Sequence, residues 1–233
     1  MTASEGAIAI VGATGALGFG LALRLGQAGA EVIVGSRDEE RARAAAARAT
    51  TVAATGSFRG AANPDAVGQS EIVVLAVPFA SHAATIKGLA EALRPGQLVI
   101  DATVPLAPAI GGRPTRLVGV WQGSAAEQTR ELLPDEVPVV AAFHTISAAM
   151  LEQLDVGLDE DVLICGDRRD DRRRAAELIA RVKGLRPVDA GPLEAARIVE
   201  SLTALLIGVN RRYGTHAGVR ITGLPRDGAW PGK

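Results

Sequence analysis

The sequence predicts an α/β protein, in which a doubly wound parallel sheet is followed by a smaller carboxyl-terminal domain. Short β-rich apolar runs alternate with helical stretches through the first 145 residues, as in parallel sheets that are covered on both faces. The first apolar run leads into a glycine-rich turn and then into a helix. Beyond His144 this pattern gives way to a shorter, more helical one. We therefore expect one domain over residues 1–150 and a second, smaller α/β domain over 151–233.

Composition limits the kinds of partner. The 233 residues are 48% hydrophobic, which is enough to bury a sizeable core and excludes general disorder. The formal net charge of −1 provides no basic field for a nucleic acid. The charged run at 167–174 mixes aspartates with arginines and is typical of a solvated helix start. We expect no nucleic-acid partner.

The single cysteine and the lack of long apolar segments indicate the compartment. Cys165 cannot form an intramolecular disulfide, and it lies in the apolar run 162–165, where a small buried hydrophobe is expected. No secretory-type segment is recognisable at the amino terminus, and no run approaches the roughly 20 apolar residues that span a bilayer. The sequence thus predicts a cytoplasmic protein without a membrane partner.

The elements of the first domain follow from apolar runs and breakers. Strands are expected at 7–11, 31–35, 71–77, 97–101 and 138–142. Helices are expected at 17–28, 38–49 and 81–93, the last ended by Pro95-Gly96.

The remaining elements are less regular. A glycine- and proline-rich loop is expected at 105–114, and Ser124 with Glu127 has capping-box spacing for a helix to about residue 133. After His144 the expected elements are a helix, a strand at 162–166, a helix at 171–182, an extended piece at 185–188 and a long helix at 192–213.

The glycine turn indicates a dinucleotide ligand. Gly12 is expected to make the turn, Gly15 to let the backbone approach a phosphate, and Gly18 to allow close packing of helix on sheet. Thr14 adds a hydroxyl. Backbone N–H groups and the helix dipole then face a pyrophosphate, as in the Rossmann fold.

The end of the second strand indicates NADP(H) rather than NAD(H). An NAD enzyme usually has Asp or Glu there for the ribose 2′-hydroxyl, whereas this chain has Ser36 and Arg37. Arg41 lies one helical turn further, so both guanidiniums can face one 2′-phosphate.

Two loops follow later strands, at the edge where open α/β sheets bind ligands. Val77 and Pro78 are candidates for backbone contact with ribose or nicotinamide, and the loop 102–105 is a weaker candidate. His82 follows the first of these loops, and we interpret it as a surface residue at a helix start.

No residues form an obvious catalytic set. The Tyr-Lys pair of short-chain dehydrogenases is missing, because Tyr213 is followed four residues later by Ala217. Neither a proton relay nor a metal site stands out. The candidate site is the segment 143–149, where small and apolar residues surround His144, which suits the stacking of a conjugated hydride acceptor. A buried structural histidine is the alternative.

The chain resembles the family of NADPH-dependent coenzyme F420 reductases over nearly its whole length. The resemblance rests on the blocks at 12–25, 32–37, 143–146, 165–167, 184–193 and 197–203. It implies reversible hydride transfer between the nicotinamide C4 of NADP(H) and C5 of the 8-hydroxy-5-deazaflavin F420. It also implies that the two cofactors stack in a cleft closed by the smaller domain.

The resemblance assigns roles to individual positions. It places Thr14, Gly15, Ala16, Leu17, Ser36, Arg37 and Arg41 in the NADP site. It places His144 and Ile146 on the deazaflavin side, where they stack and position rather than react.

Two other functions remain open from the sequence, and an oligomer is expected. One alternative is a non-catalytic NADP(H) sensor, and the other is an NADPH-dependent reductase of a flavin or an imine. The helix at 195–209 has more apolar residues than one side of a small domain can hide, which predicts a homodimer.

Overall fold

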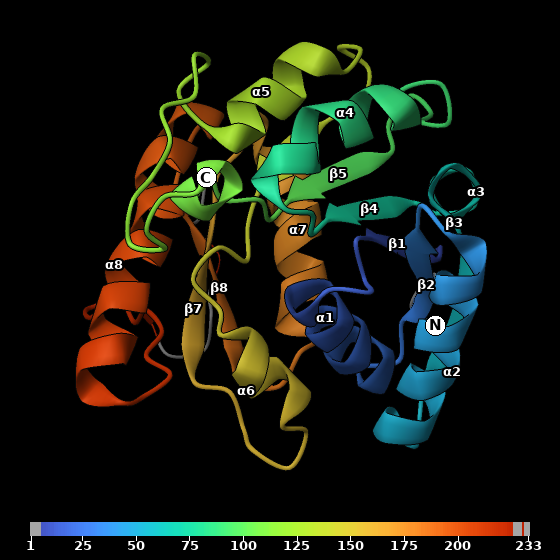
Figure 1. The fold of residues 1–233 in the computed structure, drawn as a ribbon, viewed down its shortest axis with the longest axis horizontal. Coiled ribbons are helices and arrows are strands. Elements are labelled where there is room, and N and C mark those ends of the chain that lie inside the picture. The colour runs from blue at the N-terminus through green and yellow to red at the C-terminus, as the bar shows by residue number, and fades with distance from the viewer. Residues whose placement is uncertain (1–5, 226–229, 231–233) are drawn as a thin grey trace.

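Six parallel strands form the main sheet of this chain. A computed structural model describes residues 6–225 and residue 230. The strand order is β3-β2-β1-β4-β5-β6 (Figure 1). The strands are β1 (Ile8–Val11), β2 (Glu31–Ser36), β3 (Ser57–Ala62), β4 (Ile72–Leu75), β5 (Leu98–Asp101) and β6 (Val139–Ala141). This arrangement confirms the predicted doubly wound α/β class.

Helices cover both faces of the sheet because the central strands are apolar on both sides. Every residue of β1, β4 and β5 is buried. One hydrophobic cluster joins the sheet to α1 (Ala16–Gln27), α2 (Glu39–Ala53) and α7 (Arg169–Ala180). A second cluster joins the sheet to α3 (Asn63–Gly68) and α4 (Phe79–Leu89). The two clusters hold the carboxyl ends of β1 and β4 in place.

Most expected elements are present, with shifted ends, but β3 and α3 were not predicted. The run Ser57–Ala62 contains a glycine and an arginine and lacks the β-branched residues that indicate a strand. It forms a strand by pairing with β2 at the sheet edge. β4 is shorter than expected because residues 76–78 already belong to the loop above the sheet.

The carboxyl-terminal residues build a second, two-stranded sheet. It pairs β7 (Glu160–Ile164) with β8 (Leu185–Asp189), and an antiparallel bridge between Ala141 and Cys165 links it to β6. Cys165 is buried, as expected. The remaining helices are η1 (Ala107–Ile110), α5 (Ala125–Leu132), α6 (Ala148–Glu152), η2 (Leu193–Ala195) and α8 (Ala196–Tyr213).

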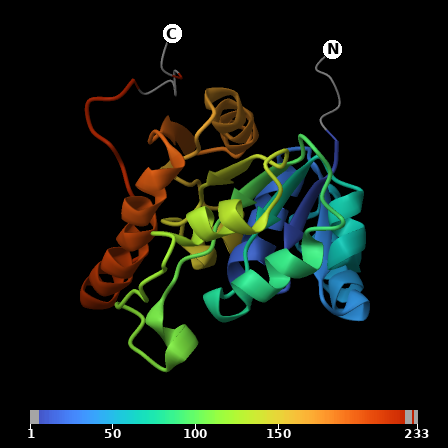
Figure 2. The ribbon, with the colours of Figure 1, turned by 90° about the horizontal axis from the view of Figure 1, so that it is seen from above.

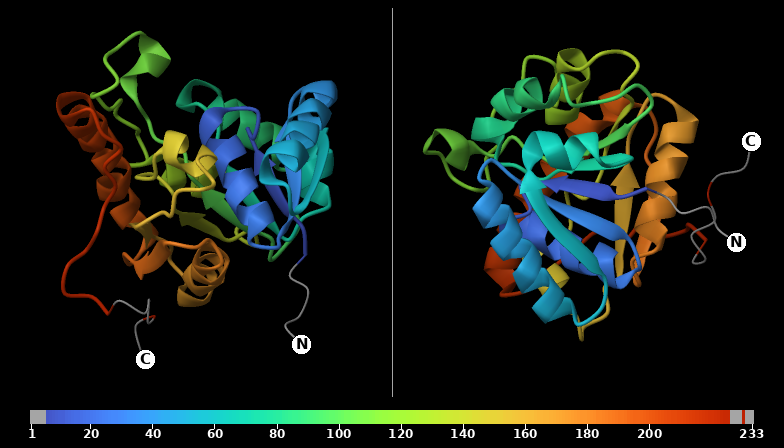
Figure 3. Two further views of the ribbon diagram at one scale, coloured as in Figure 1. Left: turned by 90° about the horizontal axis from the view of Figure 1, so that it is seen from below. Right: turned by 90° about the vertical axis from the view of Figure 1, so that its right-hand side faces the viewer.

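The long helix α8 lies at the end of the molecule opposite α2 (Figures 1 and 2). The segment that contains η1 projects beside α8, as Figures 2 and 3 show from opposite sides. In the view of Figure 1, β7 and β8 lie between α8 and the main sheet, and α5 lies beside α4. This placement brings residues from both ends of the chain to one edge of the sheet.

Candidate functional site

A pocket of about 570 Å³ opens at the carboxyl ends of β1 and β4. Here the strand order reverses direction, which is where open α/β sheets bind ligands. All the residues expected in the site line this pocket except Gly18. They are Gly12, Thr14, Gly15, Ala16, Leu17, Ser36, Arg37, Arg41, Val77, Pro78, His144 and Ile146.

The glycine turn brings three backbone segments close together. Gly12 has φ +89°, and a Cβ atom there would lie 2.5 Å from the carbonyl oxygen of Ala76. A Cβ atom on Gly18 would lie 2.7 Å from the carbonyl oxygen of Gly12. Gly18 therefore permits close packing of α1 on the turn, although it does not line the pocket.

The amino terminus of α1 points its free donors into the pocket. Gly15 is the N-cap and provides no side-chain cap, and the first turn of α1 contains no acidic residue. The first N–H groups of a helix have no partners within that helix. Thr14 and Ala16 are exposed beside them. The turn is therefore electropositive and open to an anion such as a pyrophosphate.

Two arginines form the wall of the pocket that follows β2. Arg37 and Arg41 are exposed, and neither forms an ion pair with any acidic residue in the described part of the chain. Asp38 lies between them as the N-cap of α2 and accepts a hydrogen bond from the backbone N–H of Arg41. The hydroxyl of Ser36 accepts one from the N–H of Asp38. This wall offers two uncompensated positive charges to a phosphate group.

The opposite wall is nearly neutral and contains His144. Only 5% of this residue is exposed, and neither ring nitrogen has a hydrogen-bond partner among the described residues. Burial lowers the pKa of His144 to about 4, and the nearby Asp101 carboxylate opposes this shift only weakly. The ring is therefore neutral at physiological pH. An unpaired, buried imidazole on a pocket wall is typical of a ligand-binding group.

The backbone around His144 is held in an unusual conformation. Phe143 is buried and has φ +71°, which is rare for a bulky residue. The hydroxyl of Thr203, on α8, donates a 2.7 Å hydrogen bond to the carbonyl oxygen of His144. Strained backbone of this kind concentrates at functional sites.

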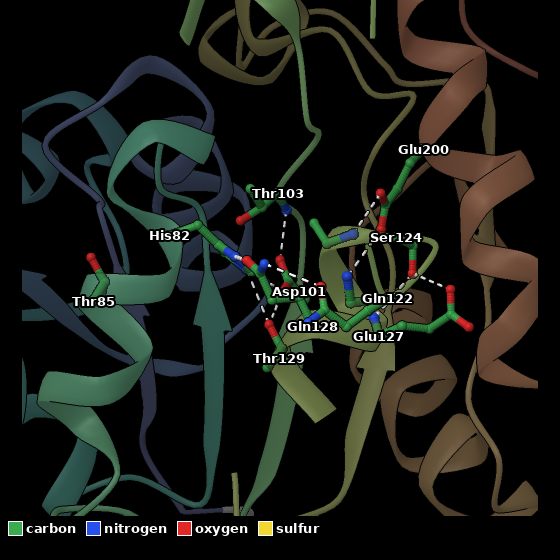
Figure 4. Close-up of polar contacts among 12 residues, drawn as sticks. His82, Thr85, Asp101, Thr103, Gln122, Ser124, Glu127, Gln128, Thr129 and Glu200 are labelled. Atoms are coloured by element: carbon green, nitrogen blue, oxygen red, sulfur yellow. Dashed lines mark hydrogen bonds and ion pairs between the residues drawn. The ribbon is translucent and has the colours of Figure 1, made fainter. Parts of the chain in front are cut away.

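His82 is a buried residue, and our interpretation of it as a surface residue was wrong. It is completely buried in α4, where Nε2 lies 2.8 Å from Asp101 Oδ2 and Nδ1 lies 3.1 Å from Gln128 Oε1 (Figure 4). The hydroxyl of Thr129 donates to the same Asp101 oxygen at 2.5 Å. The position of His82 near a helix start suggested exposure, but Gln128 and Thr129 of α5 (Ala125–Leu132) pack against it.

His82 and Asp101 each favour the charged form of the other. Burial lowers the pKa of His82, but the Asp101 carboxylate outweighs this effect and raises it overall. Burial alone would raise the pKa of Asp101, yet His82 and the hydrogen bonds from Thr129 and Thr103 lower it. Opposite charges and hydrogen bonds thus compensate for the burial of both groups.

A second buried carboxylate joins α8 to the amino terminus of α5. Glu200 accepts hydrogen bonds from the backbone N–H groups of Ala125 at 2.9 Å and Ala126 at 3.1 Å. Burial raises the pKa of Glu200 to about 8, although the two N–H groups favour its charged form. Ser124 caps the same helix through the N–H of Glu127, as the capping-box spacing predicted.

Several pocket residues were missed from the sequence. Asn63 lies at the start of α3, an element that was not predicted, and its buried Oδ1 has no partner among the described residues. Thr203 reaches the pocket from the distant helix α8. Asp101 does not line the pocket but binds the backbone N–H of Thr103, which does, and its sequence signal is a charged residue at the end of an otherwise apolar strand.

Neither a metal centre nor a membrane span is apparent in the described part of the chain. Residues 6–225 and 230 contain no group of three or more His, Cys, Asp or Glu side chains placed to hold a metal ion. Within the same residues, no helix combines the length and apolarity needed to cross a bilayer.

The strand order, the open helix terminus and the glycine turn define a Rossmann-type dinucleotide-binding protein. Residues 7–105 match the family model of NADP oxidoreductases that are coenzyme F420-dependent. The chain belongs to this family, because relatives more than 40% identical to it match over nearly its full length.

Two curated relatives and one solved structure show the extent of the similarity. The F420-dependent NADP reductase of Methanothermobacter thermautotrophicus is 43% identical over 222 residues, which are 94% of this chain and 95% of that protein. That of Methanocaldococcus jannaschii is 41% identical over 93% of this chain and 98% of its own length. A crystal structure assigned as an F420-dependent NADP-reductase from Arthrobacter superimposes with a TM-score of 0.77 at 27% identity, covering 91% of this chain and 96% of that one.

Proposed function

We propose that this chain catalyses reversible hydride transfer between NADP(H) and coenzyme F420. The observation that carries this proposal is that one pocket combines an arginine wall with a buried, neutral His144 wall. The relatives that are 41% to 43% identical are named for this pair of cofactors. When bound, the nicotinamide C4 and the deazaflavin C5 supply the two ends of the hydride transfer.

The residues of the first wall suit NADP(H). The free amino terminus of α1 takes the pyrophosphate, since it has no side-chain cap and no neighbouring acid. Gly12 lets the chain turn tightly beneath it. Arg37 and Arg41 bind the 2′-phosphate, with the Ser36 hydroxyl beside them. Val77 and Pro78 continue the wall toward the nicotinamide.

His144 and Ile146 form the surface against which the deazaflavin stacks. Both residues are more than nine-tenths buried, so they exclude water from this part of the pocket. Because the pKa of His144 is about 4, the ring does not store the proton that accompanies hydride transfer to F420 at neutral pH. We propose that no side chain reacts, and that the protein contributes position and exclusion of water.

The alternatives left open by the sequence are not favoured. A sensor does not need a water-excluding wall opposite the NADP site, and the relatives are named as reductases. Imine reductases and reductive aminases share the fold at 15% to 16% identity, which shows the fold alone.

The direct test is anaerobic mixing of the purified protein with NADPH and oxidised F420, followed by the visible absorbance of the deazaflavin. We expect rapid bleaching with NADPH, and much less with NADH. Free FMN in place of F420 is the control acceptor. Bleaching of FMN alone would assign a flavin reductase, and tight NADPH binding without any bleaching would assign a sensor.

We also propose that the chain forms a homodimer through α8. Ile198 is 66% exposed and Leu205 is 59% exposed, and both lie on the face of α8 away from the buried Val199 and Ala204. Apolar residues gathered on one helix face favour burial against a partner. Sedimentation at micromolar concentration should give twice the chain mass, and Leu205→Glu should give one chain mass. Val52→Glu, on the far helix α2, is the matched control. A monomeric wild type contradicts this proposal.

We propose that residues 151–233 form the domain that closes the deazaflavin side, which the contact of Thr203 with His144 supports. The isolated, buried Cys165 supports a reducing compartment, the cytoplasm.

A further inference from the structure

Unpaired buried polar atoms are concentrated on the wall of the site pocket. Among the described residues, six buried side-chain atoms lack hydrogen-bond partners, and four of them belong to pocket residues. These four are Asn63 Oδ1, Thr103 Oγ1, and both ring nitrogens of His144. Buried polar groups are normally paired, so unpaired ones around a cavity indicate groups that a ligand completes. Thr103 has no role in the function proposed above.

The position of Thr103 decides which part of a dinucleotide it meets. Arg37 follows β2, the glycine turn follows β1, and Thr103 follows β5, with β4 lying between β1 and β5. A dinucleotide whose 2′-phosphate is at Arg37 and whose pyrophosphate is at the turn extends its other end over β4 and β5. That end is the nicotinamide. Its one polar substituent is a carboxamide, which offers both an acceptor oxygen and a donor nitrogen.

The hydroxyl of Thr103 matches this substituent. A threonine hydroxyl can donate one hydrogen bond and accept others. Only 2% of Thr103 is exposed, so water competes little for this group. In Figure 4 the hydroxyl lies on the opposite side of the residue from the backbone N–H. It is therefore not used by the network beneath the loop.

That network holds the backbone of Thr103 in place. The N–H of Thr103 donates a 2.8 Å hydrogen bond to Oδ1 of Asp101, whose other oxygen is bound by His82 and Thr129. Asp101, His82 and Thr129 are essentially fully buried and come from β5, α4 and α5 (Figure 4). A backbone supported from three elements keeps its pocket-facing side chain in one place.

We propose that the Thr103 hydroxyl binds the nicotinamide carboxamide of NADP(H), and that Asp101 is the positioning residue that holds Thr103 for this contact. The inference rests on the proposed function, because it takes the orientation of NADP(H) from it. A carboxamide held at Thr103 limits rotation of the nicotinamide ring. The ring face is then presented to the wall formed by His144 and Ile146, where F420 is proposed to stack.

The test compares two ligands that differ only in the nicotinamide. Calorimetric titration of NADPH and of 2′-phospho-ADP-ribose, which lacks the nicotinamide, is carried out on the wild type, Thr103→Val and Thr103→Ser. We expect Thr103→Val to weaken NADPH binding by about 3- to 10-fold, the loss of one net hydrogen bond. Binding of 2′-phospho-ADP-ribose should not change, and Thr103→Ser should resemble the wild type for both ligands.

Two results overturn the proposal: unchanged NADPH affinity in Thr103→Val, or equal weakening of both ligands. If Thr103→Val does not fold, Thr103→Ala against Thr103→Ser gives the same comparison with the methyl group removed from both. The readout is binding alone, so it is independent of turnover. A further outcome is that the wild type bleaches F420 while Thr103→Val changes the affinities for NADPH and 2′-phospho-ADP-ribose equally or not at all. That combination would reject this inference and leave the proposed function in place.

The role of Asp101 is tested by a double-mutant cycle with Thr103. Asp101→Asn should weaken NADPH binding without changing that of 2′-phospho-ADP-ribose, and the double variant Asp101→Asn with Thr103→Val should be no weaker than Thr103→Val. A purely structural role for Asp101 would weaken both ligands, or would add its effect to that of Thr103→Val. Either of these outcomes removes Asp101 from the proposal.

Discussion

The hydroxyl of Thr203 donates a 2.7 Å hydrogen bond to the carbonyl oxygen of His144, 59 residues earlier in the chain. This contact connects α8 to the pocket wall on which F420 is proposed to stack. Glu200, one turn earlier on α8, binds the amino terminus of α5. The two contacts fix α8 relative to the site, although most of α8 lies at the edge of the molecule (Figure 1).

Replacement of Thr203 by valine should therefore affect the F420 side of the reaction. We expect kcat/KM for F420 to fall by about 3- to 10-fold, because one hydrogen bond to the His144 backbone is lost. Steady-state kinetics with saturating NADPH measures this change. Thr203→Ser keeps the hydroxyl and should retain the wild-type value. A fall in Thr203→Ser with an unchanged Thr203→Val would show that the methyl group, not the hydroxyl, matters.

Replacement of Arg37 by alanine should discriminate between the two nicotinamide cofactors. Arg37 has no acidic partner among the described residues, so its charge is available to a 2′-phosphate. Loss of a charge-assisted contact costs about 1.5–3 kcal/mol, which is about 10- to 150-fold in NADPH affinity. NADH binding should change little. Arg43→Ala removes an α2 arginine that pairs with Glu39 outside the pocket and is the control. Equal losses for NADPH and NADH would refute the assignment.

Replacement of His144 by alanine should separate turnover from NADPH binding. The ring lies on the proposed deazaflavin wall and has no hydrogen-bond partner within the described chain. We expect slow F420 reduction in stopped-flow traces, with NADPH affinity close to that of the wild type. A variant that fails to fold would support the alternative that His144 is a structural core histidine.

The low pKa of His144 also predicts a pH dependence of stability. In the folded protein its pKa is about 4, against 6.5 for an unperturbed histidine. As the pH falls from 6.5 toward 4, the unfolded chain binds a proton that the folded chain does not. The contribution of neutral His144 to the free energy of unfolding is therefore fully present above pH 6.5. It is lost as the pH falls toward 4, and the loss is on the order of 3 kcal/mol.

This dependence can be isolated by urea denaturation of the wild type and His144→Leu at neutral and mildly acidic pH. Leucine cannot be protonated, so the variant should lose less free energy of unfolding on acidification than the wild type does. Parallel pH profiles for the two proteins would show that His144 is not buried in its neutral form.

Arg24 should be important for stability rather than for the reaction. Its buried guanidinium donates to the carbonyl oxygens of residues 150, 151, 153 and 156, at the end of α6 and just beyond it. Arg24→Met leaves these oxygens without a charged donor, and we expect a loss of at least about 3 kcal/mol in the free energy of unfolding. Arg173→Met, which removes an exposed pair with Glu177, should cost less than about 1 kcal/mol. Similar losses in the two variants would contradict this role.

The pocket wall that contains the glycine turn and the arginines was predictable because its signals are local. The strand, the glycine turn and the helix are consecutive in the chain, and Ser36 and Arg37 follow the next strand directly. Apolar runs and turn residues specify such units over short distances. The edge strand β3 was not predictable in this way, because Ser57–Ala62 becomes a strand only by pairing with β2.

By itself, the sequence determined the class of sheet, the dinucleotide turn, the position of the arginine wall and the candidate role of His144. Only the tertiary structure decided that His82 is buried against Asp101, that Glu200 binds the start of α5, and that Thr203 reaches His144. The physical reason is that burial and hydrogen bonding of a polar side chain depend on partners far away in the chain. Local periodicity reports which face of an element is apolar, but not which distant element will cover it.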